Sequence, residues 1–231
     1  MLDIHKVKAI TLDLDDTLWP IWPTIERAEQ ALARWFAEHA PMTAALVATA
    51  ESRHEIREEV TRMHKDHAHD MSVLRRESIR LALRRAGEDH SRADEAYEVF
   101  FAERNRVELY DDALHALEFL SARFPIVALS NGNADLERVG LARYFHAAVS
   151  AREFGVGKPD ARIFHAAAAA AGVESSSVLH VGDDALLDVL GAFNAGMQTA
   201  WINRGDHPWT QEVQPHASLV SLRELCALFE A

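Results

Sequence analysis

Short apolar runs alternate with helical segments over two separated stretches of this chain, and this alternation limits the possible folds more than any other feature. The stretches are residues 1–18 and 107–231. The apolar runs are rich in β-branched residues and bounded by Gly, Pro, Asn or Ser, as strands are: Val7–Asp13, Ile126–Ser130, Ala147–Ser150, Val178–Gly182 and Thr199–Ile202. Strands that alternate with helices predict a parallel sheet covered by helices on both faces.

Helix-start and helix-stop residues mark the segments between these runs. Near the end of the chain, Ser221 and Glu224 have the spacing of a capping box. We expect helices from Asp111 towards Arg123, from Pro159 and Asp160 to Gly172, and from Asp184 to Ala195 before Gly196.

The intervening region, residues 19–106, contains no convincing strand. Thr24 is a candidate N-cap, and apolar residues then recur at helical spacing until Pro41: Ile25, Ala28, Leu32, Trp35 and Phe36. Further helical segments run to about Lys65 and from Met71 to Arg85, and Ser91 with Asp94 resembles a second capping box. The sequence therefore predicts an all-helical domain, 19–106, inserted into an α/β domain made of 1–18 and 107–231.

Composition excludes several classes of partner. The formal net charge of −12 disfavours non-specific binding to nucleic acid or to an anionic membrane. No apolar stretch reaches membrane-spanning length, and the first residues do not read as a signal peptide. Cys226 is the only cysteine, so we expect no internal disulfide and a cytoplasmic location. We expect a monomer or a homodimer.

Acidic residues follow two of the predicted strands. Asp13 and Asp15 come after the first apolar run, and alternation along a strand would point them to the same side. Asp183 follows the run Val178–Gly182 in the same way. Asp184 is a candidate helix cap, and Asp188 is either a second acid of this site or a residue on an exposed helix face.

These acids require a partner if they share one pocket. Two like charges about 4 Å apart repel by about 4 kcal/mol at an effective dielectric constant near 20. All the candidate groups are carboxylates, which are hard oxygen ligands, so we expect Mg²⁺.

Two other segments supply groups that suit a phosphate. Ser130 ends a predicted strand and is followed by Asn131 and a glycine, which together offer a hydroxyl and free backbone N–H groups. Lys158 lies between two glycines and Pro159 and can supply positive charge.

In their order along the chain, these groups resemble the four motifs of the haloacid dehalogenase-like hydrolase superfamily: Asp13/Asp15, Ser130, Lys158 and Asp183/Asp184. The resemblance implies a Rossmann-like core with a helical cap inserted after the first motif. It implies that Asp13 is the nucleophile, Asp15 the acid and base, and Ser130, Asn131 and Lys158 the groups that bind phosphate. Mg²⁺ would be held by Asp13, the backbone carbonyl of Asp15 and Asp183, with support from Asp184 or Asp188.

Asp15 separates the reactions of this family. Its dehalogenases lack a carboxylate there, because a halide needs no proton to leave, whereas an alkoxide does. Asp15 therefore favours Mg²⁺-dependent hydrolysis of a small phosphorylated metabolite through an aspartyl-phosphate. Sugar phosphomutase, haloacid dehalogenase and phosphate-accepting signalling domain remain alternatives. The stretch 13–20, with Pro23, is similar to bacterial phosphatases of flavin mononucleotide and of the phosphorylated ribitylamino-uracil precursor of riboflavin.

Three weaker signals lie outside the motifs. Trp19 and Trp22 either stack on a flat substrate ring or hold the cap against the core. Arg76, Arg80 and Arg84 share one helical face, which is either solvated or an anion clamp. Arg204 follows the last clear strand and either faces the mouth of the active site or, as we favour, has an ordinary surface role.

Overall fold

The computed structural model describes residues 1–205 and 207–230 and divides into two compact units. The α/β unit comprises Met1–Pro20, Glu108–Gly132 and the described chain from Leu136 onward. The helical unit comprises Ile21–Val107 and the short segment Asn133–Asp135. These boundaries lie within two residues of those predicted from the sequence, but the sequence did not indicate that Asn133–Asp135 would join the helical unit.

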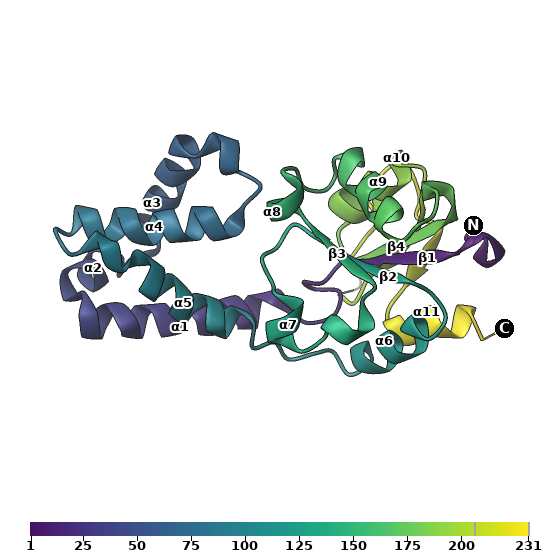
Figure 1. Ribbon diagram of the computed structural model, residues 1–231, viewed down its shortest axis with the longest axis horizontal. Coiled ribbons are helices and arrows are strands. Elements are labelled where there is room, and N and C mark those ends of the chain that lie inside the picture. The colour runs from purple at the N-terminus through teal and green to yellow at the C-terminus, as the bar shows by residue number, and fades with distance from the viewer. Residues whose placement is uncertain (206, 231) are drawn as a thin grey trace. The chain divides into compact units, whose positions relative to one another are not determined.

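A six-stranded parallel sheet forms the centre of the α/β unit (Figure 1). The strand order is β3-β2-β1-β4-β5-β6, and every neighbouring pair is parallel. The strands are β1 (Ala9–Leu12), β2 (Ile126–Ser130), β3 (Ala147–Ser150), β4 (Val178–Gly182), β5 (Gln198–Ile202) and β6 (Ala217–Leu219). The predicted parallel sheet is confirmed. Because β1 lies between β2 and β4, the residues that follow these three strands meet at one edge.

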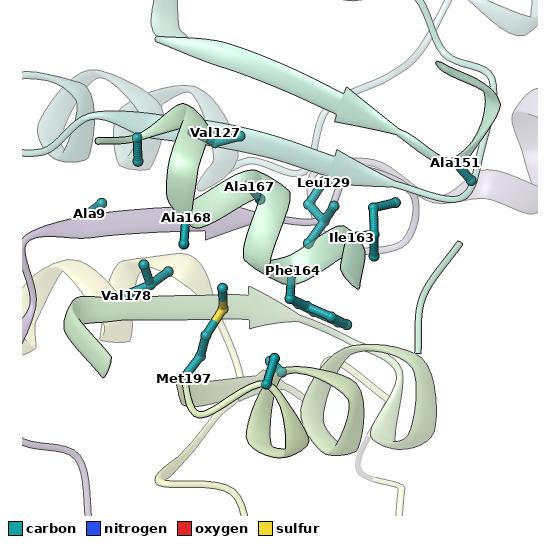
Figure 2. Close-up of a cluster of buried hydrophobic side chains, with 13 residues drawn as sticks. Ala9, Val127, Leu129, Ala151, Ile163, Phe164, Ala167, Ala168, Val178 and Met197 are labelled. Atoms are coloured by element: carbon teal, nitrogen blue, oxygen red, sulfur yellow. The ribbon is translucent and has the colours of Figure 1, made fainter. Parts of the chain in front are cut away.

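Helices cover both faces of this sheet, with α9 and α10 on one side and α6 and α11 on the other (Figure 1). They are α6 (Ala113–Ser121), α9 (Ala161–Ala170), α10 (Gly191–Asn194) and α11 (Leu222–Leu228), with the short helices α7 (Leu136–Val139) and α8 (Ala151–Phe154). Helix α9 packs on the strands through Ile163, Phe164, Ala167 and Ala168, which are all buried (Figure 2). The alanine run of α9 thus lets the helix lie close to the sheet.

The helical unit contains α1 (Ile21–His39), α2 (Pro41–Leu46), α3 (Ala50–Met63), α4 (Met71–Arg85) and α5 (Ala93–Arg104). The residues of α1 predicted to face inward do so: Ala28, Leu32, Trp35 and Phe36 are buried. They join Tyr97, Phe100 and Phe101 of α5 in one apolar core. Among the described residues, no helix has both the length and the apolar character that a membrane span requires.

Several predicted element boundaries were wrong because tertiary contacts override local signals. The first strand is Ala9–Leu12 rather than Val7–Asp13. Strand β6 was missed, because three residues at the sheet edge carry too little pattern to detect. The segment 184–195 is a π-helix, Ala185–Leu190, followed by α10.

Helix caps were also misplaced in three cases. Thr24 lies buried inside α1, which begins at Ile21. The residue before α6 is Asp112 rather than Asp111. Asp89, and not Ser91, caps the turn that precedes α5. At α11, Ser221 accepts a hydrogen bond from Glu224 N as expected, whereas the Glu224 carboxylate accepts from Val220 N instead of Ser221.

Candidate active site

Asp13 stands at the centre of the sheet edge at which β1, β2 and β4 end. Its backbone N–H donates to the carbonyl of Val181 at 2.9 Å, which extends the β1–β4 ladder by one residue and fixes the position of its side chain. The side chain is buried, with the residue 7% exposed. A buried carboxylate costs considerable free energy unless it is paired, so its neighbours decide what it can do.

Lys158 is the principal partner of Asp13. Its ammonium lies 2.5 Å from Asp13 Oδ1 and 2.6 Å from Asp188 Oδ1, and all three side chains are almost completely buried. The Asn131 side chain holds the Lys158 backbone from both sides: Lys158 N donates to Oδ1 at 2.7 Å and Nδ2 donates to Lys158 O at 2.9 Å. A Cβ on Gly157 would lie 2.6 Å from Asn131 Oδ1, so this loop requires glycine there.

The Asn131 side-chain amide thus positions the lysine loop, a role that the sequence did not indicate. The predicted contact between this turn's backbone N–H groups and a phosphate stays a prediction. Ser130 is buried at the end of β2, and its Oγ accepts a hydrogen bond from Gly132 N at 2.9 Å. The hydroxyl hydrogen of Ser130 is thus directed away from that amide.

Asp188 joins the site from the π-helix Ala185–Leu190. It is 1% exposed, which excludes the exposed helix face considered from the sequence. Its Oδ2 accepts from Asp184 N at 3.0 Å. A Cβ on Gly182 would lie 2.3 Å from Asp188 Cγ, so glycine at the end of β4 makes room for this carboxylate.

Asp183 and Asp184 are adjacent in the sequence, but their side chains make different contacts. Asp183 Oδ1 accepts from Thr17 Oγ1 at 3.2 Å, and its backbone carbonyl accepts from the Trp201 indole at 2.6 Å. Asp184 is exposed and accepts from Leu186 N and Leu187 N, which makes it the cap of the following turn. The capping role predicted for Asp184 is confirmed.

Carboxylate oxygens of Asp13, Asp183 and Asp188 lie within 4.8 Å of one another. Burial raises the pKa of Asp13 well above its usual value; Lys158 opposes this shift, and the charges of Asp188 and Asp183 add to it. Burial, followed by the charges of Asp188 and Asp16, raises the pKa of Asp183 to about 7. Burial also acts to raise the pKa of Asp188, but Lys158 and His180 outweigh it and the pKa is lowered.

Lys158 itself stays charged in this environment. Burial acts to lower its pKa, but the neighbouring Asp13 and Asp188 carboxylates outweigh burial and raise it. One ammonium thus faces three carboxylates, two of which have raised pKa values. The cluster lacks positive charge, and its donors are all hard oxygens. The residues present therefore fit a divalent cation such as Mg²⁺.

Asp15 does not join this carboxylate cluster. Its Oδ1 accepts a hydrogen bond from the Trp19 indole at 2.8 Å. The chain leaves the extended conformation at Asp16, whose φ is +58°, and Asp16 N donates to Trp19 O at 2.7 Å. Asp15 thus lies in a tight turn that begins two residues after Asp13. Trp19 is completely buried, which excludes it as a stacking platform for a substrate ring, whereas Trp22 is 75% exposed.

Sequence reasoning missed three residues that support the site. His180 Nε2 lies 3.0 Å from Asp188 Oδ1, and its Nδ1 lies 2.8 Å from Thr11 Oγ1. Burial lowers the pKa of His180 in spite of Asp188, so a neutral ring donating to Asp188 fits both contacts. The detectable signal was a histidine within an otherwise apolar strand. Thr17 and Trp201, which bond to Asp183, gave no separate signal.

The surface role favoured for Arg204 needs correction. Arg204 is half-buried: it forms a bidentate pair with Asp112, and its guanidinium donates to the carbonyl of Thr17 at 3.1 Å. Of the three arginines considered as a solvated face or an anion clamp, Arg84 is exposed, and Arg76 and Arg80 form ion pairs within the helical unit. Arg76 pairs with Asp94 at 2.9 Å, and Arg80 pairs with Glu77.

Comparisons with known proteins identify the family. A sequence profile of haloacid dehalogenase-like hydrolases matches residues 7–196. The chain is 32% identical over 97% of both chains to 5-amino-6-(5-phospho-D-ribitylamino)uracil phosphatase YigB of Escherichia coli K12. It is 38% identical to a phosphoserine phosphatase of Thermus thermophilus, over 66% of this chain and 64% of the relative.

A solved structure described as a 2-haloacid dehalogenase, from Pseudomonas syringae pv. tomato DC3000, is 38% identical with a TM-score of 0.91. The match covers 97% of this chain and 100% of the other. The chain belongs to the haloacid dehalogenase-like hydrolases, and the resemblance inferred from its motifs is confirmed.

Proposed function

We propose that the protein is a Mg²⁺-dependent phosphatase that hydrolyses a small phosphate monoester through an aspartyl-phosphate on Asp13. The observation that carries the proposal is the convergence of Asp13, Asp183 and Asp188 within 4.8 Å, with Lys158 as their buried cation. Such a set of charges suits phosphoryl transfer, which depends chiefly on positioning and on stabilising negative charge.

In this proposal Asp13 attacks phosphorus with one carboxylate oxygen, and the bond from phosphorus to the leaving oxygen breaks. Lys158 holds Asp13 in place and, with the Ser130 hydroxyl and backbone N–H groups of the following turn, attracts the phosphoryl oxygens. Asp15 gives its proton to the leaving oxygen and then takes a proton from the water that hydrolyses the aspartyl-phosphate.

Asp13, Asp183 and the backbone carbonyl of Asp15 would hold Mg²⁺, and Asp188 would support the site while holding Lys158. The ion supplies the positive charge that the cluster lacks and stabilises charge on the phosphoryl group. Asp188 is the better candidate for this support, because the Asp184 carboxylate is engaged as a helix cap.

The relatives support a choice of first substrates. YigB is named for a ribitylamino-uracil phosphate, and it aligns with 97% of this chain. We propose a phosphorylated riboflavin precursor or flavin mononucleotide as the first substrates to test. The helical unit would then act as the cap that selects among phosphate esters.

A second candidate is 2-haloacid dehalogenase, because the structure from P. syringae carries that description. Two residues argue against a dehalogenase. Asp15 is the proposed proton donor and Asp183 a proposed cation ligand, and displacement of a halide needs neither.

The test measures phosphate release from flavin mononucleotide, phosphoserine and p-nitrophenyl phosphate beside halide release from 2-chloropropionate. We expect phosphate release that needs Mg²⁺, stops with EDTA and is lost in Asp13→Asn. Because both reactions use Asp13, Asp15→Asn is the discriminating variant: it should strongly lower phosphate release from flavin mononucleotide and phosphoserine, whose leaving alkoxides need a proton, and leave any halide release intact. Halide release without phosphate release would contradict the phosphatase.

A further inference from the structure

We propose that Trp19 is a positioning residue for the proposed acid Asp15, and that its indole N–H assigns the transferred proton to Asp15 Oδ2. This inference rests on the proposed phosphatase function. It starts from one contact that the motif does not require, the hydrogen bond from Trp19 Nε1 to Asp15 Oδ1 at 2.8 Å.

The turn around Asp15 holds the indole in place. Trp19 is 0% exposed, so its ring cannot swing into solvent. A backbone bridge joins Asp15 to Trp19, and Asp16 N donates to Trp19 O. Leu18 N donates to Leu14 O at 2.8 Å, and Leu18 O accepts from Tyr110 N at 2.9 Å. The turn is therefore fixed on both sides of the indole, and so is the direction of its N–H.

The indole N–H can only donate a hydrogen bond. The oxygen that accepts it, Oδ1, is favoured as the carbonyl or negatively charged oxygen of Asp15, because hydrogen bonding stabilises charge there. When Asp15 carries a proton, that proton is accordingly favoured on Oδ2. During cleavage it passes from Oδ2 to the leaving ester oxygen, while Asp13 forms its bond to phosphorus, and Asp15 is left as a carboxylate.

A fixed proton donor matters most where the leaving oxygen is strongly basic. Phenolate needs a proton to leave, whereas p-nitrophenolate is a weak base and departs without one. Phenyl phosphate and p-nitrophenyl phosphate have nearly the same shape, so the pair isolates the acid step. General acid catalysis contributes about 10²–10⁴-fold, and small displacements of a catalytic group forfeit much of it.

The test compares kcat/KM of wild type and Trp19→Phe on these two esters. This parameter covers steps up to cleavage of the ester bond, so the later hydrolysis of the aspartyl-phosphate does not enter it. We expect Trp19→Phe to lower kcat/KM for phenyl phosphate about tenfold or more, and for p-nitrophenyl phosphate less than about threefold. Asp15→Asn should show the same pattern with a larger loss.

Trp35→Phe is the matched control. It also deletes an indole N–H that donates to a carboxylate, that of Glu95 at 3.2 Å, but within the helical unit. We expect both esters to be hydrolysed at the wild-type rate by this variant. If Trp19→Phe does not fold, Trp19→Met fills much of the same space with a flexible apolar side chain.

Equal losses on the two esters would show that Trp19 only supports the fold, and the inference would be wrong. No loss on either ester would overturn it as well. Failure of the wild-type protein to release phosphate from either ester would instead refute the proposed phosphatase, so the two failures are distinct.

Discussion

Charged side chains of the α/β unit and of the helical unit differ in how far they are removed from water. In the α/β unit the side chains of Asp13, Lys158 and Asp188 are only 9%, 3% and 2% exposed. In the helical unit the Arg76–Asp94 pair is 36% and 67% exposed. Buried ions are costly unless fully paired, whereas exposed ion pairs contribute little either way.

This difference in exposure distinguishes the candidate active site from an ordinary helix surface. The buried set keeps two acids against one lysine, with Asp183 close by, an arrangement that stability alone would not favour. The exposed set consists of ion pairs of ordinary geometry on a helix surface. Substitutions should therefore have large effects in the first region and small ones in the second, and the following predictions test that contrast.

The largest effect is expected for Lys158→Met. Removing the ammonium leaves the Asp13 and Asp188 carboxylates buried without their shared partner. Loss of one member of a buried ion pair costs about 3–5 kcal/mol, so the free energy of unfolding in urea should fall by about that much. Phosphate release should fall below detection. An active variant of unchanged stability would contradict the assignment of Lys158.

The next largest effect should separate two adjacent acids. Asp183→Asn removes a proposed Mg²⁺ ligand and should lower kcat/KM for p-nitrophenyl phosphate about 10²–10³-fold, the usual cost of losing one group that stabilises the transition state. It should also raise the Mg²⁺ concentration needed for half-maximal activity.

Asp184→Asn is the matched control, because asparagine also caps helices well. Its kcat/KM should stay within about twofold of wild type, since a cap lies outside the chemistry. Equal losses in the two variants would contradict the separate tasks that the structure gives these residues.

The Asp112–Arg204 pair lies between the two extremes of burial. Burial acts to raise the pKa of Asp112, but the Arg204 guanidinium outweighs it and the pKa is lowered in the folded state. Because the folded pKa lies below the unfolded value, the pair stabilises the protein above the unfolded pKa of 3.8. That contribution is lost as the pH falls through the folded pKa.

Asp112→Asn should therefore lower the free energy of unfolding at pH 7 by about 1.5–3 kcal/mol, the range for hydrogen bonds to charged groups. The difference from wild type should shrink as the pH approaches and passes below 3.8. Urea unfolding of wild type and Asp112→Asn, at pH 7 and at pH values down to below 3.8, measures this difference in the free energy of unfolding. A difference that is independent of pH would show that packing, not the ion pair, is lost.

The smallest effect is expected for Arg76→Ala in α4. Its pair with Asp94 is partly exposed, at 36% for Arg76 and 67% for Asp94, so the free energy of unfolding should change by less than about 1 kcal/mol. We also expect kcat/KM for flavin mononucleotide to stay within about twofold of wild type, because the guanidinium is engaged with Asp94. If kcat/KM fell tenfold or more while the free energy of unfolding stayed unchanged, Arg76 would instead act in the substrate-anion clamp considered from the sequence.

Much of the fold could be predicted from local patterns. Strands β1, β2, β4 and β5 were found because a strand buried on both faces must be almost continuously apolar. The partly buried edge strand β3 was found from its short apolar run alone. Helix α4 was found at Met71–Arg85, and the inward face of α1 followed from helical periodicity. Strand β6 could not be predicted, because its three residues gain their conformation from pairing with β5.

The motif residues Asp13, Ser130, Lys158 and Asp183 could be chosen from the sequence because strand ends, glycines and a proline mark them. The role of Asp188 could not be decided, since the same spacing fits an exposed helix face or a buried site. Only the π-helix and the space left by Gly182 turn its side chain towards Lys158.

The sequence by itself determined that acids and a lysine follow the strands of a parallel sheet, because strand and turn signals are local. Tertiary structure alone decided which carboxylates lie close enough to interact electrostatically, which one caps a helix and which one accepts the hydrogen bond from the Trp19 indole. Those outcomes depend on distances of a few ångströms between residues far apart in the chain, and electrostatic and hydrogen-bond energies change steeply over such distances.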